Sequence, residues 1–193
     1  MSIYHYCLMT NHVHLVGCPS RANALRPFMQ RLNLLYAKYL RRTYGHVGHV
    51  WQDRFKSLFV ADDAHLLQCG AYIELNPVRA KVVPTPAAYS WSSYRAYANG
   101  TADPLVTFSP AYLALDANLV GCQRRYREFV ERQLQPLPSN WFQQRVLGSV
   151  ESLAALREGS DFQVLPRSRG RPKKSLLRET ELTAATQYSK DKK

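Results

Sequence analysis

Two histidines in the segment TNHVHLVG, residues 10–17, stand one residue apart among apolar residues. In an extended strand, residues i and i+2 point to the same face about 7 Å apart, so His12 and His14 could hold one divalent cation between two imidazoles. Val13 and Leu15 would then face the core. The same spacing also fits two partly exposed strand histidines that hydrogen-bond to their neighbours, and the pattern alone does not separate these interpretations.

Tyr72 and Asn76 could add further chemistry from a helix. Residues four apart are neighbours on one helical face, with Cβ atoms about 5–6 Å apart. A tyrosine, whose reference pKa is about 10, is a weak nucleophile at neutral pH, but a metal that polarises the electrophile can compensate. The chain holds 12 tyrosines, so a packing role for Tyr72 is the alternative.

Zinc is a competing use of the same region, since Cys7, His12, His14 and Cys18 are all zinc-ligand types within a short span. Their spacing lacks the CxxC or HxxxH pairs of common zinc modules, which makes a structural zinc site the weaker interpretation. The four cysteines are expected to be reduced thiols.

The net charge of +12 at pH 7, from 26 Lys and Arg against 14 Asp and Glu, makes nucleic acid the first partner to consider. The segment RGRPKK, residues 169–174, is a second and independent indication. No stretch approaches the roughly 20 apolar residues of a membrane helix, and the amino terminus lacks a signal-peptide layout, so a cytoplasmic protein without a membrane partner is expected. The candidate DNA contacts in the basic segment are Arg169, Arg171, Lys173 and Lys174.

Periodicity predicts the elements that must position these residues. Residues 3–17 favour a hairpin, residues 49–62 a strand, and residues 63–76 a helix that Pro77 ends. Residues 89–98, YSWSSYRAYA, are expected as a strand or as packing against the sheet. Residues 23–44 predict a helix capped by Asn23 and Gly45. Its expected buried stripe is Leu25, Phe28, Met29, Leu32, Leu35, Tyr36 and Tyr39.

Four segments, in this order and at this spacing, together resemble one known family. They are YCLMTNHVHLV, GHVWQDRFKS, YIELNPVRAKVV and YSWSSYRAY, and the resemblance runs from about Ile3 to Tyr97. The chain is similar to the REP-associated tyrosine transposases, a branch of the insertion-sequence-like single-tyrosine HUH transposases. Four linked motifs are far more specific than two histidines alone.

The resemblance implies a metal-dependent transposase that cleaves and rejoins single-stranded DNA through a 5′-phosphotyrosine intermediate. It implies that His12, His14 and Asn76 bind Mg²⁺ or Mn²⁺ and that Tyr72 is the nucleophile. Single-stranded DNA with REP-like hairpins is the implied partner, and the protein would be a monomer or a homodimer. Further candidates for holding phosphates, chosen from charge, are Arg31, Lys38, Arg41, Arg54 and Lys56, while Trp51 or Phe55 are candidates for stacking a base.

The expected fold class is α+β, an antiparallel sheet with helices packed on one face, in the ferredoxin-like manner of HUH transposases. Family members carry a strand and a helix ahead of the segment that matches IYHYCLM, so this first strand and helix are expected to be missing. That would leave an unpaired edge beside the histidine strand. The expected organisation is a truncated transposase domain over 1–100, a helical extension over 101–160 and a basic, disordered tail over 161–193. A hairpin-binding protein without catalysis is the alternative function.

Overall fold

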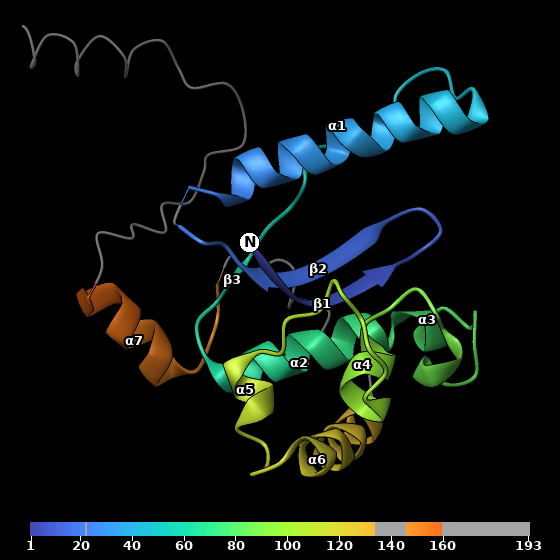
Figure 1. Ribbon diagram of the computed structural model, residues 1–193. Helices are drawn as coiled ribbons and strands as arrows, with labels where there is room; N and C mark the ends of the chain where they lie inside the picture. The colour runs from blue at the N-terminus through green and yellow to red at the C-terminus, as the bar shows by residue number, and fades with distance from the viewer. Residues whose placement is uncertain (22, 134–145, 160–193) are drawn as a thin grey trace, which may run out of the picture. The chain divides into compact units, whose positions relative to one another are not determined.

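A short antiparallel hairpin forms at the amino terminus of the chain, as the sequence predicts. The computed structural model in Figure 1 describes residues 1–21, 23–133 and 146–159. Strand β1 (Ser2–Leu8) pairs with strand β2 (Val13–Cys18), and the register shifts once between Ile3 and His5. The connection is closed by a hydrogen bond from Met9 N–H to His12 C=O of 2.9 Å.

The two edges of this hairpin differ. The outer edge of β1 is covered, because Leu8 N–H donates to Trp91 C=O and Thr107 N–H donates to Ile3 C=O, both at 2.8 Å. Within the described residues, the only strand that pairs with β2 is β1. The histidine strand therefore lies at an edge of the described sheet.

Helix α2 (Asp63–Glu74) runs beside the hairpin (Figure 1) and begins where its sequence predicts. Asp62 caps its amino terminus by accepting a hydrogen bond of 2.9 Å from the His65 N–H. The helix ends at Glu74, and after Leu75 a second short helix, α3 (Asn76–Arg79), begins with Pro77 in its first turn. Proline is tolerated there because the first N–H groups of a helix have no partner within it.

Helix α1 (Leu25–Tyr44) forms as expected and ends at Gly45 in a left-handed conformation with φ of 64°. Its first residue follows Ala24, which makes no side-chain cap, so the prediction of Asn23 as the cap is wrong. The predicted burial of its apolar stripe is also wrong, because no residue of α1 is buried. The periodicity sets which side chains share a face, but only a packing partner buries that face.

The strand prediction for residues 49–62 largely fails, while one of the two alternatives for residues 89–98 is observed. Within residues 49–62 only Phe59–Val60 forms a strand, β3, which pairs in parallel with β4 (Val146–Leu147). The rest of that segment is irregular because the described ladder offers it no further partner. Residues 94–99 form helix α4 (Tyr94–Asn99), after a short turn of 3₁₀ helix, η1 (Pro86–Ala88). This segment packs against the sheet, because Ser93 N–H donates to Tyr6 C=O at 3.0 Å and Tyr97 OH donates to Tyr4 C=O at 2.8 Å.

Three more helices follow, in the region where the sequence predicts helical structure. They are α5 (Pro110–Leu113), α6 (Leu119–Arg132) and α7 (Val150–Gly159). Helix α6 packs against α4 and α5, and α5 packs against α2. None of the helices in the described ranges is long and apolar enough to cross a membrane.

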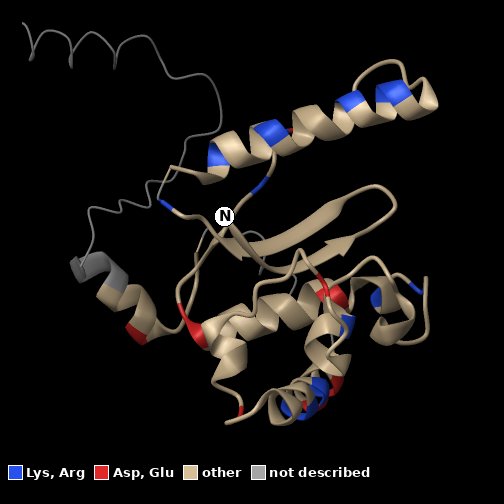
Figure 2. Ribbon diagram, in the orientation of Figure 1, with Lys and Arg blue, Asp and Glu red and all other residues tan. Residues whose placement is uncertain are grey.

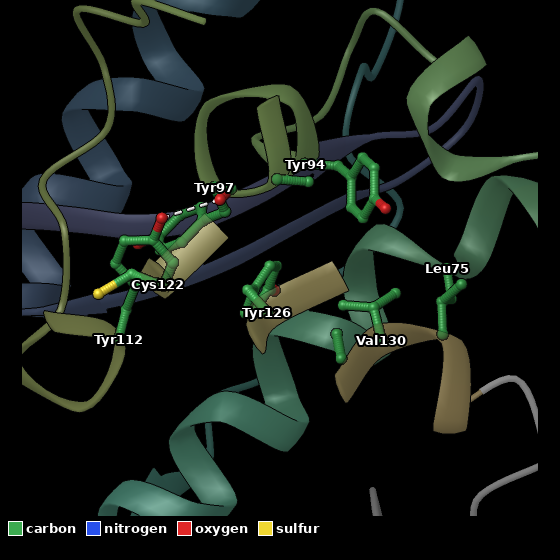
Figure 3. Packing of buried hydrophobic residues seen from close by; sticks show 9 residues of the cluster. Leu75, Tyr94, Tyr97, Tyr112, Cys122, Tyr126 and Val130 are labelled. Atoms are coloured by element: carbon green, nitrogen blue, oxygen red, sulfur yellow. Dashed lines mark hydrogen bonds between the residues drawn. The ribbon is translucent and has the colours of Figure 1, made fainter. Parts of the chain in front are cut away.

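The core lies among α2, α4, α5 and α6 and is rich in tyrosine (Figure 3). Tyr97, Tyr112 and Tyr126 are fully buried. Two of their hydroxyls bond to backbone, from Tyr97 to Tyr4 C=O and from Tyr112 to Tyr97 C=O, each at 2.8 Å. Each ring therefore buries a large apolar area without leaving its polar end unsatisfied. The structure is α+β, with a small antiparallel sheet and helices, in agreement with the predicted class.

Candidate active site

The histidines project from the face of the hairpin that packs against α2. His14 pairs with Cys7 in the strand register, and directly paired residues point to the same face. Cys7 is fully buried, whereas Val13 is 42% exposed. The prediction that Val13 and Leu15 face the core is therefore wrong, because α2 covers the face of the hairpin that carries Cys7 and His14.

His12 and His14 lie side by side, as their spacing predicts. Their ring centroids are 4.8 Å apart in an edge-to-face arrangement. The Nδ1 atom of His12 lies 2.6 Å from the amide oxygen of Asn11, which accepts a hydrogen bond when Nδ1 carries the proton. That tautomer leaves the Nε2 lone pair of His12 free to bind a ligand.

His14 is half-buried, and burial followed by the neighbouring His12 lowers its pKa to about 4. Both causes disfavour the protonated ring. At neutral pH, His14 is therefore a neutral imidazole, the form that binds metals.

Tyr72 is brought to the histidines from α2. Its ring centroid lies 6.5 Å from that of His14, again edge to face, and the side chain is half-buried. Tyr72 belongs to the last turn of a helix that packs directly on both strands. The structure thus places Tyr72 beside the histidine pair. Helical spacing alone could not distinguish it from the other tyrosines.

Asn76 follows Tyr72 by one helical turn. The path between them is nearly continuous, because Leu75 N–H donates to Ala71 C=O at 3.0 Å and Ala80 N–H donates to Asn76 C=O at 2.8 Å. The side-chain Nδ2 of Asn76 is buried and has no hydrogen-bond partner among the described residues. A buried amide group that lacks a partner is unusual in a folded protein. Because Nδ2 is a donor, the atom of Asn76 that could bind a cation is its amide oxygen.

Arg79 is a site residue that sequence reasoning missed. Its guanidinium carbon lies 4.8 Å from the centre of the Tyr72 ring, a cation–π distance. One terminal nitrogen donates to Tyr72 C=O at 3.0 Å and the other to Gln133 C=O at 2.9 Å. Burial lowers the pKa of Arg79, while the negative form of Tyr72 favours its charge. The available signal was its spacing of seven residues, or two helical turns, from Tyr72.

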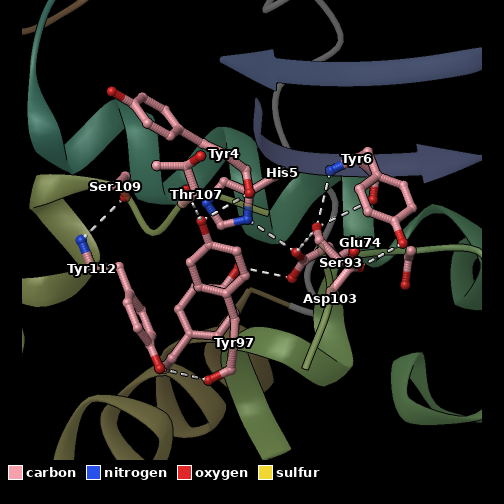
Figure 4. Close-up of polar contacts among 12 residues, drawn as sticks. Tyr4, His5, Tyr6, Glu74, Ser93, Tyr97, Asp103, Thr107, Ser109 and Tyr112 are labelled. Carbon is pink, nitrogen blue, oxygen red and sulfur yellow. Dashed lines mark hydrogen bonds and ion pairs between the residues drawn. The ribbon is translucent and has the colours of Figure 1, made fainter. Parts of the chain in front are cut away.

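A buried polar network holds this end of α2 in place (Figure 4). Glu74, fully buried, accepts hydrogen bonds from Ser93 Oγ at 2.5 Å and from Tyr126 OH at 2.8 Å. Its Oε1 also lies 3.0 Å from His5 Nδ1. Among the described residues, His5 Nε2 has no hydrogen-bond partner. The network ties α2 to β1 and α6 two residues beyond Tyr72.

Gly70 sets how closely α2 approaches β1. A Cβ atom at this position would lie 2.6 Å from both Cε1 and Nε2 of His5. Any side chain here would push the helix and the strand apart. The glycine is therefore required by close approach, and it lies two residues before Tyr72.

The predicted phosphate-binding residues occupy two places in the described chain. Arg31, Lys38 and Arg41 lie exposed on α1 (Figure 2), while Arg54 and Lys56 lie exposed in the irregular segment between α1 and β3. The sequence pattern predicts a strand over this segment, but Arg54 and Lys56 do not lie on a strand. Outside the described residues lie Arg169, Arg171, Lys173 and Lys174.

The zinc interpretation is contradicted. Cys7 pairs with His14, but Cys18 pairs with Ser2 at the opposite end of the hairpin. Across the described residues, no group of three or more His, Cys, Asp or Glu side chains is placed to hold a metal. Without cysteine ligands, the two histidines alone do not complete a zinc site.

The segment that carries these residues is similar to a known family. Residues 1–76 match the family model of IS200-like transposases. The matched segment contains His12, His14 and Tyr72 and ends at Asn76. No curated protein and no solved structure matches the chain.

Proposed function

We propose that the protein is a metal-dependent tyrosine transposase that cleaves and rejoins single-stranded DNA at hairpins of the REP type. The observation that carries the proposal is the convergence of three rings, His12, His14 and Tyr72, at one end of α2. The family match over residues 1–76 supports it independently.

The residues present fit a divalent cation. His14 is neutral at neutral pH, and His12 can present Nε2. Asn76, one helical turn after Tyr72, can offer an amide oxygen. Two imidazoles and one amide oxygen would hold Mn²⁺ or Mg²⁺ with coordination positions left over for phosphate oxygens and water. When bound, such an ion neutralises charge on the scissile phosphate.

Tyr72 is the proposed nucleophile. Its phenol loses its proton, the oxygen forms a bond to phosphorus, and the phosphorus–O3′ bond breaks. The DNA 5′ end then remains on the enzyme as a phosphotyrosine, and the leaving oxygen takes up a proton to become a free 3′ hydroxyl. Attack by the 3′ hydroxyl of another strand reverses these steps and joins the ends without an external energy source.

Arg79 is the proposed positioning residue for this step. Its guanidinium lies over the Tyr72 ring and is itself held by two backbone carbonyls, at 3.0 Å and 2.9 Å. A fork held at both tips restricts the ring in a way that a flexible lysine would not. A ring held in one orientation loses less conformational entropy when it reaches the geometry for in-line attack on phosphorus.

DNA binding would draw on the positive charge of the chain. Arg31, Lys38 and Arg41 on α1 are proposed phosphate contacts. The exposed pair Arg54 and Lys56, in the segment before β3, is proposed for the same role. Each phosphate contact steepens the salt dependence of binding.

The test is covalent capture on a denaturing gel. The chain is incubated with a 5′- or 3′-labelled hairpin oligonucleotide carrying single-stranded flanks, in Mn²⁺ or in Mg²⁺. A covalent band is expected with the wild type and is lost in Tyr72→Phe and His14→Ala. Matched controls are Tyr4→Phe, on the hairpin strand β1, and His46→Ala, an exposed histidine after α1; both retain the band.

Absence of a band in both metals, with hairpin binding intact, would contradict the proposal and favour a hairpin-binding protein without catalysis. A band that persists in Tyr72→Phe but is lost after another tyrosine is changed would contradict the assignment of the nucleophile alone.

A further inference from the structure

Helix α1 exposes a row of aromatic rings. Tyr36, Tyr39 and Tyr44 are 44%, 50% and 68% exposed. Their rings are neighbours, with centroids 6.4 Å apart for Tyr36 and Tyr39 and 5.9 Å apart for Tyr39 and Tyr44. Trp51 extends this aromatic row, because its ring lies 5.6 Å from Tyr36 and its Nε1–H donates to Asn33 C=O at 3.2 Å.

Positive charge lies beside the aromatic row. Every charged residue of α1 is basic, as Figure 2 shows along the helix. Arg31, Lys38 and Arg42 are separated by seven and four residues, so they share one side of the helix. Arg42 also follows Tyr39 by three residues, so the two side chains are neighbours on the helix surface. The basic row therefore runs beside the aromatic row.

We propose that this surface of α1 binds unpaired nucleotides of single-stranded DNA, with bases on the aromatic row and phosphates on the basic row. Exposed rings beside cations are the combination by which proteins hold single strands without reading their sequence. Paired bases cannot use it, because a duplex keeps the faces of its bases stacked on one another. The choice of DNA rests on the proposed function, whereas the stacking itself does not.

A second copy of the chain fits this surface less well. The exposed tyrosines and leucines alone would suit self-association. However, two copies meeting through α1 would bring two basic rows together with no acidic residue on either helix to pair with them. Like charges facing one another oppose such a contact, whereas a polyanion neutralises them.

The test measures binding with catalysis removed. The full chain carrying Tyr72→Phe is titrated in EDTA against a fluorescein-labelled oligothymidine of 20 nucleotides, followed by anisotropy, with a duplex of equal length as comparison. Exchanging both Tyr36 and Tyr39 for leucine keeps the helix apolar and well formed but removes two stacking rings. We expect binding to weaken by about tenfold or more.

Two matched controls and one charge variant complete the design. Leu34→Ala changes an apolar side chain 54% exposed that lies beside Arg31 and Lys38 but away from Tyr36 and Tyr39, and Trp91→Leu removes an aromatic ring 64% exposed outside α1. Both are expected to bind within about twofold of the parent. Arg42→Gln is expected to lower the slope of log affinity against log salt by about one.

Unchanged affinity in the double tyrosine variant would overturn the proposal, as would equal affinity for duplex and single strand. So would a dimer of the parent in sedimentation that the double variant dissociates, because it would assign the surface to a second copy. The outcome is separable from the proposed chemistry. If the double tyrosine variant loses oligothymidine binding but the wild-type chain gives no covalent band, the surface is supported and the transposase chemistry is rejected. If the wild-type chain gives the covalent band but the double variant binds oligothymidine normally, the chemistry is supported and the surface is rejected.

Discussion

Replacing Gly70 by alanine tests whether close packing of α2 on the hairpin positions the site. The added Cβ would lie 2.6 Å from Cε1 and Nε2 of His5 and 2.8 Å from Nδ1. The His5 ring has little room to yield. It stacks on Tyr97 with ring centroids 4.0 Å apart, and its Nδ1 lies 3.0 Å from Glu74 Oε1.

The expected sign is opposite to that of an ordinary helical glycine. Gly→Ala inside a helix usually stabilises by about 1 kcal/mol, whereas forcing an extra carbon into a packed core costs about 1–3 kcal/mol. Because the ring is held on two sides, we expect the larger cost and a net loss of about 1–2 kcal/mol. For a chain of this length that lowers Tm by about 2–8 °C.

Urea denaturation and thermal melting measure the effect, and a double-mutant cycle assigns it. In a His5→Ala background the ring is gone, so Gly70→Ala is expected to become stabilising. The rate of covalent capture should fall in Gly70→Ala, since Tyr72 follows two residues later. A single variant as stable as the wild type, or the same loss in both backgrounds, would refute the packing argument.

Three further predictions concern single side chains. Arg79→Met is expected to slow covalent capture by about 10- to 100-fold while leaving hairpin affinity unchanged, because it frees the Tyr72 ring; single-turnover gels and anisotropy measure the two quantities. Tyr126→Phe is expected to cost about 1.5–3 kcal/mol of unfolding free energy in urea, since it removes one of the hydrogen bonds to buried Glu74. Burial raises the pKa of Asp62, but hydrogen bonds from the backbone and side chain of its neighbours outweigh burial and hold the pKa at about 2. The wild type should therefore be more stable than Asp62→Asn above about pH 4, and this difference should vanish as the pH falls from about 4 towards 2.

Each has a matched comparison. Arg79→Lys keeps the charge but loses the fork, and should recover only part of the rate; full recovery would show that charge alone suffices. Tyr89→Phe removes a single solvent-exposed hydrogen bond to backbone, from the OH of half-buried Tyr89 to Leu8 C=O at 2.6 Å. An equal cost in both tyrosine variants would contradict a special role for the Glu74 network. A pH-independent difference for Asp62→Asn would contradict the charge argument.

Local sequence determined the elements that depend on short-range rules. The alternating run around His14 and the turn before it specify the hairpin, and Asp62 sets the start of the helix that carries Tyr72. It also determined which residues could converge, because strand spacing puts His12 beside His14 and helical spacing puts Asn76 one turn after Tyr72.

Tertiary packing decided what local patterns leave open. Residues 49–62 look like one strand, yet among the described residues only Phe59–Val60 finds a partner strand, because a strand exists only where another chain segment completes its hydrogen bonds. The stripe on α1 is amphipathic in sequence but is not buried by any part of the chain that the structure describes, since burial depends on a packing surface and not on periodicity.

The same division holds within the site. Sequence alone nominated the histidines and Tyr72, but the hydrogen bond from Arg79 to Gln133 and the network on Glu74 join residues far apart in the chain. Such contacts depend on how α2 sits between the hairpin and α6, which the close approach at Gly70 permits. Residue type and spacing define what chemistry is possible, and the packing of α2 decides which of the many tyrosines is placed to perform it.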